Sequence, residues 1–330
     1  MRAAVLTGPA AIEVRERDAP RPDPHEVVVR VESVGICGTD LSIHAGKIPV
    51  TYPRVMGHEI VGTVEAGADA RGERVLVDPG IACGRCRQCR EGRTNICTAG
   101  WLIGRDRDGG LCELVAVPAS NVHPLPDGLD SSTAPVIQVL ATCVHAQRRI
   151  RVFPEESVVV LGLGVTGLLH LQLARLRGAR PVIGITRSAA KLSIARELGA
   201  DLTISAEGTE VEAVREALPD GADLVIECVG TVDAMARSME MVRTGGRILA
   251  YGTMTETAGA LPFYDLYHKE ISILGARSAR VEDFPLAIDA VASGRIALDP
   301  LVSGRHALAD VDGAIRTAGA PGALKVFVDV

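Results

Sequence analysis

The chain of 330 residues lacks the marks of several protein classes. No segment reaches the roughly 18 uncharged apolar residues of a membrane span, and the N-terminal MRAAVLTGPA has no charged region followed by a sustained apolar stretch. Basic charge is not in excess, because 35 Lys and Arg stand against 41 Asp and Glu, and this argues against a nucleic-acid partner. Eight cysteines are too few for a disulfide scaffold. We therefore expect a cytoplasmic protein that binds neither membrane nor nucleic acid.

The length, with 47% hydrophobic and 23% charged residues, indicates a globular protein of two domains. The first part has short β-branched runs broken by Gly, Pro and Asp, which favour an antiparallel, barrel-like β region. These runs are 27–31, 55–64 and 74–77. From about residue 155, apolar runs alternate with helix-like stretches, and about six strands predict a doubly wound parallel sheet of the α/β class. The last segment, ending in KVFVDV, is expected to return to the first domain. The predicted division is 1–139, 140–275 and 276–330.

Four cysteines crowd into one short segment with the spacing C-x2-C-x2-C-x7-C. They are Cys83, Cys86, Cys89 and Cys97. Four thiolates suit tetrahedral zinc, and a shell closed by four cysteines leaves no position for substrate, so the pattern predicts a structural zinc site. A zinc ribbon that reads nucleic acid is the alternative. The local arginines lack aromatic stacking residues, and this favours a solvated loop surface instead.

A second set of metal-binding side chains is spread over two segments. Cys37 lies on a glycine-flanked turn in VGICGTDLSIHAG, and His58 and Glu59 follow after twenty intervening residues in GHE. A thiolate, an imidazole and an adjacent carboxylate are suitable ligands or near neighbours of a catalytic zinc.

A glycine-rich turn follows the apolar run VVVLG and precedes a helix-like stretch. Its residues are Gly162, Leu163, Gly164, Val165, Thr166 and Gly167. Strand before and helix after is the context that a dinucleotide-binding G-x-G-x-x-G requires. The second strand of this region ends in GITRS, where Thr186 replaces the usual acidic residue and Arg187 follows. A guanidinium without a neighbouring carboxylate favours a 2′-phosphate, so we expect NADP(H), with NAD(H) as the alternative.

In this order and spacing, the motifs resemble those of the zinc-containing medium-chain dehydrogenases, nearest to the sorbitol and threonine dehydrogenase branch. The resemblance covers nearly the whole chain. It implies a GroES-like β-barrel catalytic domain followed by a Rossmann domain with a six-stranded sheet. It also implies two zinc ions per chain, one catalytic and one structural, and a homodimer or homotetramer.

The same resemblance implies roles for the residues of the catalytic site. Cys37 and His58 are implied as zinc ligands, Glu59 as a carboxylate able to swing onto the metal, and Thr39 as the hydroxyl that relays a proton. Relatives usually have Cys, Glu or Asp at the remaining ligand position, where this chain has Gln138. An amide oxygen brings no charge, so we expect weaker metal binding unless Glu59 also coordinates.

Other matching positions extend the relay and the cofactor site. Where the family often has histidine at the outer end of its relay, this chain has Ser42, with His44 two residues later. Either side chain is a candidate for passing the proton outward, and a polar surface role for His44 is the alternative. Thr142 matches a residue near the nicotinamide and Lys325 one near the pyrophosphate.

Together these features predict reversible hydride transfer between a secondary alcohol, either a polyol or a sugar-derived one, and NADP+. Two alternatives are kept. The neutral Gln138 suggests a zinc-free reductase of quinones or enones, and the altered relay at Ser42 suggests a catalytically silent sensor that binds NADP.

Overall fold

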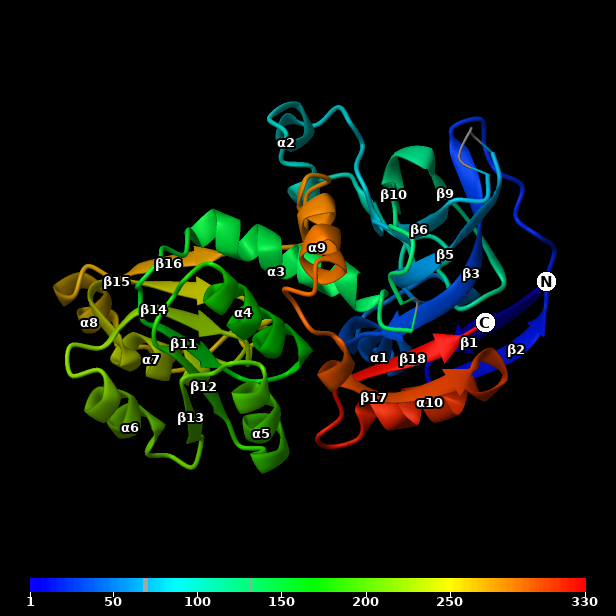
Figure 1. Ribbon diagram of the computed structural model, residues 1–330. Helices are drawn as coiled ribbons and strands as arrows, with labels where there is room; N and C mark the ends of the chain where they lie inside the picture. Colours follow the sequence, from blue (N-terminus) through cyan, green and yellow to red (C-terminus); the bar gives the residue numbers. More distant parts are fainter. Residues whose placement is uncertain (68–70, 131) are drawn as a thin grey trace. The chain divides into compact units, whose positions relative to one another are not determined.

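The computed structural model describes residues 1–67, 71–130 and 132–330, which form two compact units (Figure 1). The first unit comprises Met1–Ala141, Arg280–Gly294 and Leu298–Val330, and the second Thr142–Ala279 and Arg295–Ala297. Helix α3 (Val136–Ile150) contains the boundary between them. The two units are defined by contacts within the chain and do not test which function each part has. The division into 1–139, 140–275 and 276–330 therefore stays a prediction. Within the described residues, no helix is both long enough and apolar enough to cross a membrane.

The first unit consists mainly of antiparallel strands. Its strands are β1 (Arg2–Gly8), β2 (Ala11–Glu16), β3 (Glu26–Ile36), β4 (Arg54–Val55), β5 (Glu59–Ala66), β6 (Arg74–Val77), β7 (Gly80–Ile81), β8 (Trp101–Leu102), β9 (Leu114–Pro118), β10 (Val122–Pro124), β17 (Val302–Ala307) and β18 (Lys325–Asp329). Its helices are α1 (Gly38–His44), α2 (Arg87–Arg90), α9 (Asp283–Ala292) and α10 (Val311–Gly319). The main sheet has the order β10-β6-β5-β3-β18-β17, with β9 also paired to β3. The antiparallel β region predicted for the first part of the chain is confirmed.

Strand β3 lies at the centre of this unit. Its valines are almost wholly buried, because β-branched side chains pack well on both faces of a covered sheet. Strand β18, nearly 300 residues further along the chain, is inserted between β3 and β17, with Val326 opposite Ile36. This pairing brings Lys325, at the start of β18, next to the end of β3, where Cys37 follows.

The apolar run predicted over 55–64 does not form one strand. Strand β4 ends at Val55, and β5 begins at Glu59. Between them Gly57 has a φ of +90°, and a Cβ at this position would lie 2.8 Å from a methyl carbon of Val34. Only glycine adopts this turn without strain, and the turn presents His58 immediately before β5.

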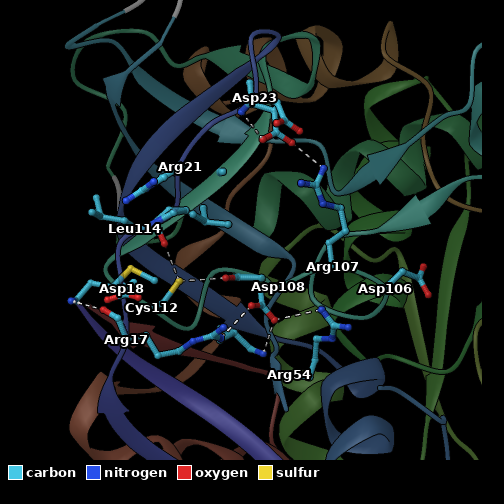
Figure 2. A pocket seen from close by; sticks show the side chains of 17 residues that line it. Arg17, Asp18, Arg21, Asp23, Arg54, Asp106, Arg107, Asp108, Cys112 and Leu114 are labelled. Atoms are coloured by element: carbon cyan, nitrogen blue, oxygen red, sulfur yellow. Dashed lines mark hydrogen bonds and ion pairs between the residues drawn. The ribbon is translucent and has the colours of Figure 1, made fainter. Parts of the chain in front are cut away.

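A hollow of about 470 Å³ on the first unit is lined largely by charged side chains (Figure 2). The carboxylate of Asp108 accepts hydrogen bonds from Arg17 at 2.9 Å, Arg54 at 3.2 Å and the backbone N–H of Val55 at 3.0 Å. Backbone hydrogen bonds of 2.8–3.0 Å then join the residues after Asp108 to the three residues before His58. The ion pairs of this hollow therefore stabilise the segment that carries His58.

The second unit is a six-stranded parallel sheet with helical connections. Its strands are β11 (Val158–Leu161), β12 (Val182–Thr186), β13 (Leu202–Ser205), β14 (Ala222–Glu227), β15 (Val242–Ala250) and β16 (Ser272–Gly275). Its helices are α4 (Val165–Leu176), α5 (Ala189–Glu197), α6 (Glu210–Ala217), α7 (Val232–Met241) and α8 (Phe263–His268). The strands are arranged in the order β13-β12-β11-β14-β15-β16 (Figure 1). Across the sheet, their numbering falls up to β11 and rises from β14 onward, although all the strands stay parallel. This is the Rossmann arrangement, and the predicted doubly wound sheet is confirmed.

Candidate functional site

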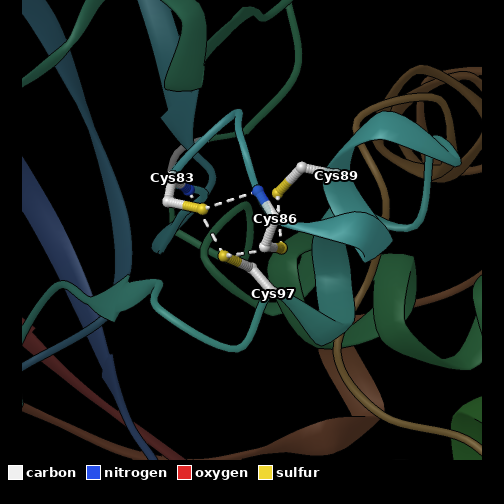
Figure 3. Close-up of side chains that lie close together, drawn as sticks. All are labelled: Cys83, Cys86, Cys89 and Cys97. Carbon is white, nitrogen blue, oxygen red and sulfur yellow. Dashed lines mark hydrogen bonds between the residues drawn. The ribbon is translucent and has the colours of Figure 1, made fainter.

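The four clustered cysteines converge around one point (Figure 3). Their sulfur atoms all lie within 4.8 Å of one another, with Cys86 Sγ 3.5 Å from Cys89 Sγ and 3.8 Å from Cys97 Sγ. Around a tetrahedral zinc with bonds near 2.3 Å, neighbouring sulfurs stand about 3.8 Å apart. The cluster therefore has the donor set and the dimensions of a structural zinc site.

Local backbone geometry brings these sulfur atoms together and favours the thiolate form of Cys86. Helix α2 begins directly after Cys86, so that Cys86 and Cys89 share one helical turn. Gly84 and Gly92 adopt positive φ angles of +70° and +72°, which reverse the chain on either side. Hydrogen bonds from the backbone N–H groups of Cys89 and Thr98 lower the pKa of the Cys86 thiol to about 5. A thiolate is the form that binds zinc.

A second candidate metal centre joins the end of β3 to the start of β5. One ligand atom from each of Cys37, His58 and Glu59 lies within 4.8 Å of the others. Cys37 precedes α1, and Glu59 is the first residue of β5. Burial opposes ionisation of the Cys37 thiol, but the hydrogen bond and charge of His58 outweigh it and lower the pKa of Cys37. Thiolate, imidazole and carboxylate form the donor set of a catalytic zinc.

Asp40 is a member of this site that the sequence reasoning missed. Its carboxylate is buried and accepts hydrogen bonds from the N–H groups of Cys37 at 2.9 Å and Gly57 at 3.1 Å. Its Oδ1 lies 3.4 Å from His58 Nδ1. A carboxylate behind a metal-binding histidine fixes the orientation of its ring. The available signal was the position of Asp40 three residues after Cys37, where it forms a capping box for α1.

Lys325 lies against Glu59. Its ammonium is buried, donates to Glu59 Oε1 at 2.6 Å and also donates to the carbonyl of Ile36 at 3.2 Å. The other carboxylate oxygen of Glu59, Oε2, is buried and has no hydrogen-bond partner within the described chain. An unpartnered buried oxygen beside a thiolate and an imidazole fits a site built to receive a cation. The contact of Lys325 with the pyrophosphate stays a prediction.

Helix α1 carries the residues predicted for the proton relay. Thr39 and Ser42 are three residues apart and therefore lie on the same face of the helix, and both are half-buried. His44 lies two residues beyond Ser42, and two helical steps turn its side chain to the other side of α1. Its Nε2 atom is buried without a hydrogen-bond partner among the described residues. Gln138 lies in the first turn of α3, where it is buried.

In the second unit, the three glycines of the fingerprint differ in their backbone conformation and surroundings. Gly162 has a φ of +95°, and a Cβ on Gly167 would lie 1.9 Å from the carbonyl oxygen of Gly162. A Cβ on Gly164, by contrast, would meet no atom of the described residues within 4 Å. Gly164 also precedes α4, whose first turn has no side-chain cap. Open space before an uncapped helix N-terminus, which begins with Val165 and Thr166, suits a pyrophosphate.

The end of β12 carries the residues predicted to select the cofactor. Thr186 closes the strand, and the exposed Arg187 follows without an ion pair to any described residue. On α3, the hydroxyl of Thr142 lies 2.6 Å from that of Tyr251. The sequence reasoning missed Tyr251, because its hydroxyl meets Thr142 only through the fold.

Comparisons with known proteins place this geometry in a family. Residues 23–127 match the alcohol dehydrogenase GroES-like domain, and residues 165–293 match the zinc-binding dehydrogenase domain. L-galactonate-5-dehydrogenase of Escherichia coli K12 is 34% identical, and the alignment covers 94% of this chain and 92% of that protein. The chain belongs to the zinc-containing alcohol dehydrogenase family. Family membership confirms the resemblance predicted from the motifs and makes this protein an oxidoreductase with GroES-like and Rossmann domains.

Two further family members show how far the similarity extends. A sorbitol dehydrogenase of Halalkalibacterium halodurans is 30% identical, with 99% of each chain covered. The crystal structure of a zinc-binding dehydrogenase from Sinorhizobium meliloti 1021, bound to NADP, superimposes with a TM-score of 0.94 at 36% identity and covers 100% of this chain and 99% of that one. The similarity therefore includes both the structural-zinc loop and the cofactor half.

Proposed function

We propose that this protein interconverts a secondary alcohol, either a polyol or a sugar-derived one, and its ketone, using a catalytic zinc and NADP(H). The observation that carries the proposal is the convergence of Cys37, His58 and Glu59 within 4.8 Å. The similarity to a sorbitol dehydrogenase and to a sugar-acid dehydrogenase supports the substrate class.

The residues of the site have separate tasks in this proposal. Cys37 and His58 would hold the metal, with Glu59 or Gln138 completing its shell. A zinc ion supplies a Lewis acid that lowers the pKa of a bound hydroxyl. Asp40 keeps the imidazole of His58 in one orientation, and the Lys325 ammonium keeps one oxygen of Glu59 in place. Thr39 accepts the alcohol proton and passes it along α1 to Ser42, because these two hydroxyls share a helix face.

The proposal is tested by metal analysis combined with turnover. Purified protein would be assayed for zinc content and for NADP+-coupled oxidation across a panel of polyols, sugar acids and simple secondary alcohols. We expect two zinc ions per chain, and Cys37→Ser should lose one of them together with turnover. Cys112→Ser is the control, because Cys112 belongs to neither candidate metal site and a serine hydroxyl can donate to the backbone carbonyls that its thiol contacts.

The outcomes separate the candidate functions. One zinc ion per chain with full activity on enones or quinones would support the zinc-free reductase instead. Dinucleotide binding without oxidation of any alcohol in the panel would support the sensor. Undiminished alcohol turnover in the Cys37→Ser variant would refute the proposal.

The preference for NADP(H) is the second part of the proposal. Its support is the exposed Arg187 next to Thr186, with no carboxylate at the end of β12. Arg187→Ala should lower kcat/KM for NADP+ by roughly tenfold, the size of one charge-assisted hydrogen bond, and leave NAD+ unchanged. Arg196→Ala on the exposed side of α5 is the control. An equal loss with both dinucleotides would overturn the assignment.

We also propose that the protein is a homodimer or homotetramer assembled through β16. This strand is an edge of the second unit's sheet, and Ile273 within it is 39% exposed. The preceding helix α8 exposes three aromatic side chains, Phe263, Tyr264 and Tyr267. Uncovered edges and apolar patches of this kind favour pairing with a second copy.

Light scattering of two lysine variants tests this interface. Ile273→Lys should yield monomers, because a charge on the edge of a strand opposes pairing. Leu202→Lys on β13, the opposite edge of the same sheet, is equally exposed at 39% and serves as the control. Assembly that survives Ile273→Lys would contradict the proposal.

A further inference from the structure

The strand order of the second unit divides its ligand-binding edge into two sides. In a doubly wound sheet, a dinucleotide binds across the carboxyl ends of the strands at the point where the order reverses, here between β11 and β14. The turn after β11 holds the fingerprint glycines, and Arg187 follows β12 on one side. The adenosine belongs on that side, so the other half of the dinucleotide extends over the ends of β14 and β15. Tyr251 is the first residue after β15.

The hydroxyl of Tyr251 joins separate parts of this edge. It lies 2.6 Å from Thr142 Oγ1 on α3 and 3.6 Å from the Cys143 sulfur, which donates to it. The same sulfur lies 3.8 Å from the carbonyl oxygen of Thr166, within the fingerprint turn. One phenolic group therefore ties α3 to the end of β15, and Cys143 extends the connection to the turn proposed to bind the pyrophosphate.

The ring of Tyr251 is fixed from its other side by His170 on α4. The two rings meet edge to face, with centroids 4.5 Å apart at an angle of 82°. Gln147 holds the imidazole in turn, with its Nε2 atom 3.2 Å from His170 Nδ1 and donating to the His170 carbonyl at 2.8 Å. Burial lowers the pKa of His170 to about 3, so the imidazole is neutral and the contact keeps its form across the working pH range.

We propose that Tyr251 is a positioning residue for the nicotinamide half of the dinucleotide, acting through the hydroxyl of Thr142. The proposal rests on the proposed function, because it requires that the second unit bind NAD(P). Both side chains are half-buried, and a hydroxyl has one donor and two acceptor positions. The bond to Tyr251 fixes the rotation of the Thr142 hydroxyl before the ligand arrives.

Calorimetric binding of two ligands to the full-length protein tests this role. NADP+ carries both halves of the dinucleotide, whereas 2′-phospho-ADP-ribose lacks the nicotinamide. Tyr251→Phe should weaken NADP+ binding roughly fivefold, the size of one neutral hydrogen bond, and leave 2′-phospho-ADP-ribose unchanged. Thr142→Val should weaken NADP+ binding at least as much, and the double variant should show little loss beyond that of Thr142→Val, because both changes remove the bond between the two hydroxyls. Tyr52→Phe, in the first unit, is the matched control.

Steady-state kinetics provide a second measurement, which a merely structural role of Tyr251 would not change. We expect Tyr251→Phe to raise KM for NADP+ and leave the KM for the alcohol unchanged. Equal weakening of both ligands, or no change in either, would overturn the positioning role. A wild-type chain that binds neither ligand would instead refute dinucleotide binding itself, so failure of the proposed function is distinguishable from failure of this inference.

Discussion

Asp40→Asn is the substitution that tests the architecture of the candidate catalytic centre most directly. In the structure, Oδ1 of Asp40 accepts the Gly57 N–H and faces His58, while Oδ2 accepts the Cys37 N–H. An asparagine has one carbonyl oxygen and one amino group in place of two equivalent oxygens. In either orientation of the amide, one backbone N–H is therefore left facing another donor.

Asp40→Asn is expected to lower both the folding stability and the affinity for the catalytic zinc. Leaving a buried N–H unsatisfied costs about 1–3 kcal/mol of folding free energy, and Asp40 is only 1% exposed, so water cannot compensate. Removing the charge also releases the orientation of the His58 imidazole. Substitution of such a carboxylate behind a ligand weakens metal binding or activity by roughly 10–100-fold. The two losses predict a protein that is modestly destabilised and that loses its catalytic zinc during dialysis.

Thermal unfolding and zinc analysis before and after dialysis measure these losses separately. Asp220→Asn, an exposed aspartate in the second unit, is the control and should behave as the wild type. Added zinc should restore part of the Asp40→Asn activity, because the ligands themselves remain. A dialysed Asp40→Asn variant with two zinc ions per chain and wild-type kcat/KM would show that Asp40 does not orient His58.

Four other substitutions follow from the same structure. Gly164→Ala should keep wild-type stability but weaken dinucleotide binding, measured by calorimetry, by tenfold or more. Gly167→Ala should lower the free energy of unfolding, measured in urea, by about 1–3 kcal/mol, because its Cβ would lie 1.9 Å from the Gly162 carbonyl oxygen. Cys97→Ala should remove the structural zinc and make the cysteine loop sensitive to proteolysis, while the catalytic zinc remains. Burial raises the pKa of Asp78 to about 7, so wild-type stability should fall as pH rises from about 4 to about 7. Asp78→Asn should abolish that fall, with a gain of at most about 4 kcal/mol at pH 8 and none near pH 4 in urea unfolding.

The sequence was most informative where the interacting residues are close together in the chain. Cys83 to Cys97 lie on one loop, so their spacing alone predicts a shared metal. The glycine turn is equally local, since a strand and a helix flank it directly. The parallel sheet was predictable because each strand and helix shows its own apolar period.

Contacts between distant segments were not predictable in this way. Asp40 acts on a turn seventeen residues further along the chain, and the Tyr251 hydroxyl meets Thr142 across more than a hundred residues. Strand β18 enters the first unit's sheet beside β3, and no local periodicity predicts which strand it joins. The contact of Lys325 with Glu59 depends on this insertion, and the pyrophosphate contact that the resemblance implies for Lys325 stays a prediction.

The Lys325–Glu59 pair also limits how Glu59 can take part in metal binding. Breaking a buried ion pair by withdrawing one partner costs several kcal/mol, so Oε1 is expected to stay with the Lys325 ammonium. Only Oε2 is available to a cation, and the space it occupies exists because residue 35 is glycine, where a Cβ would lie 2.0 Å from that oxygen. Glu59 would then bind through a single oxygen and still leave a position for the Gln138 amide. The two residues would therefore be compatible ligands, and the charge of Glu59 next to the metal would make a neutral Gln138 tolerable.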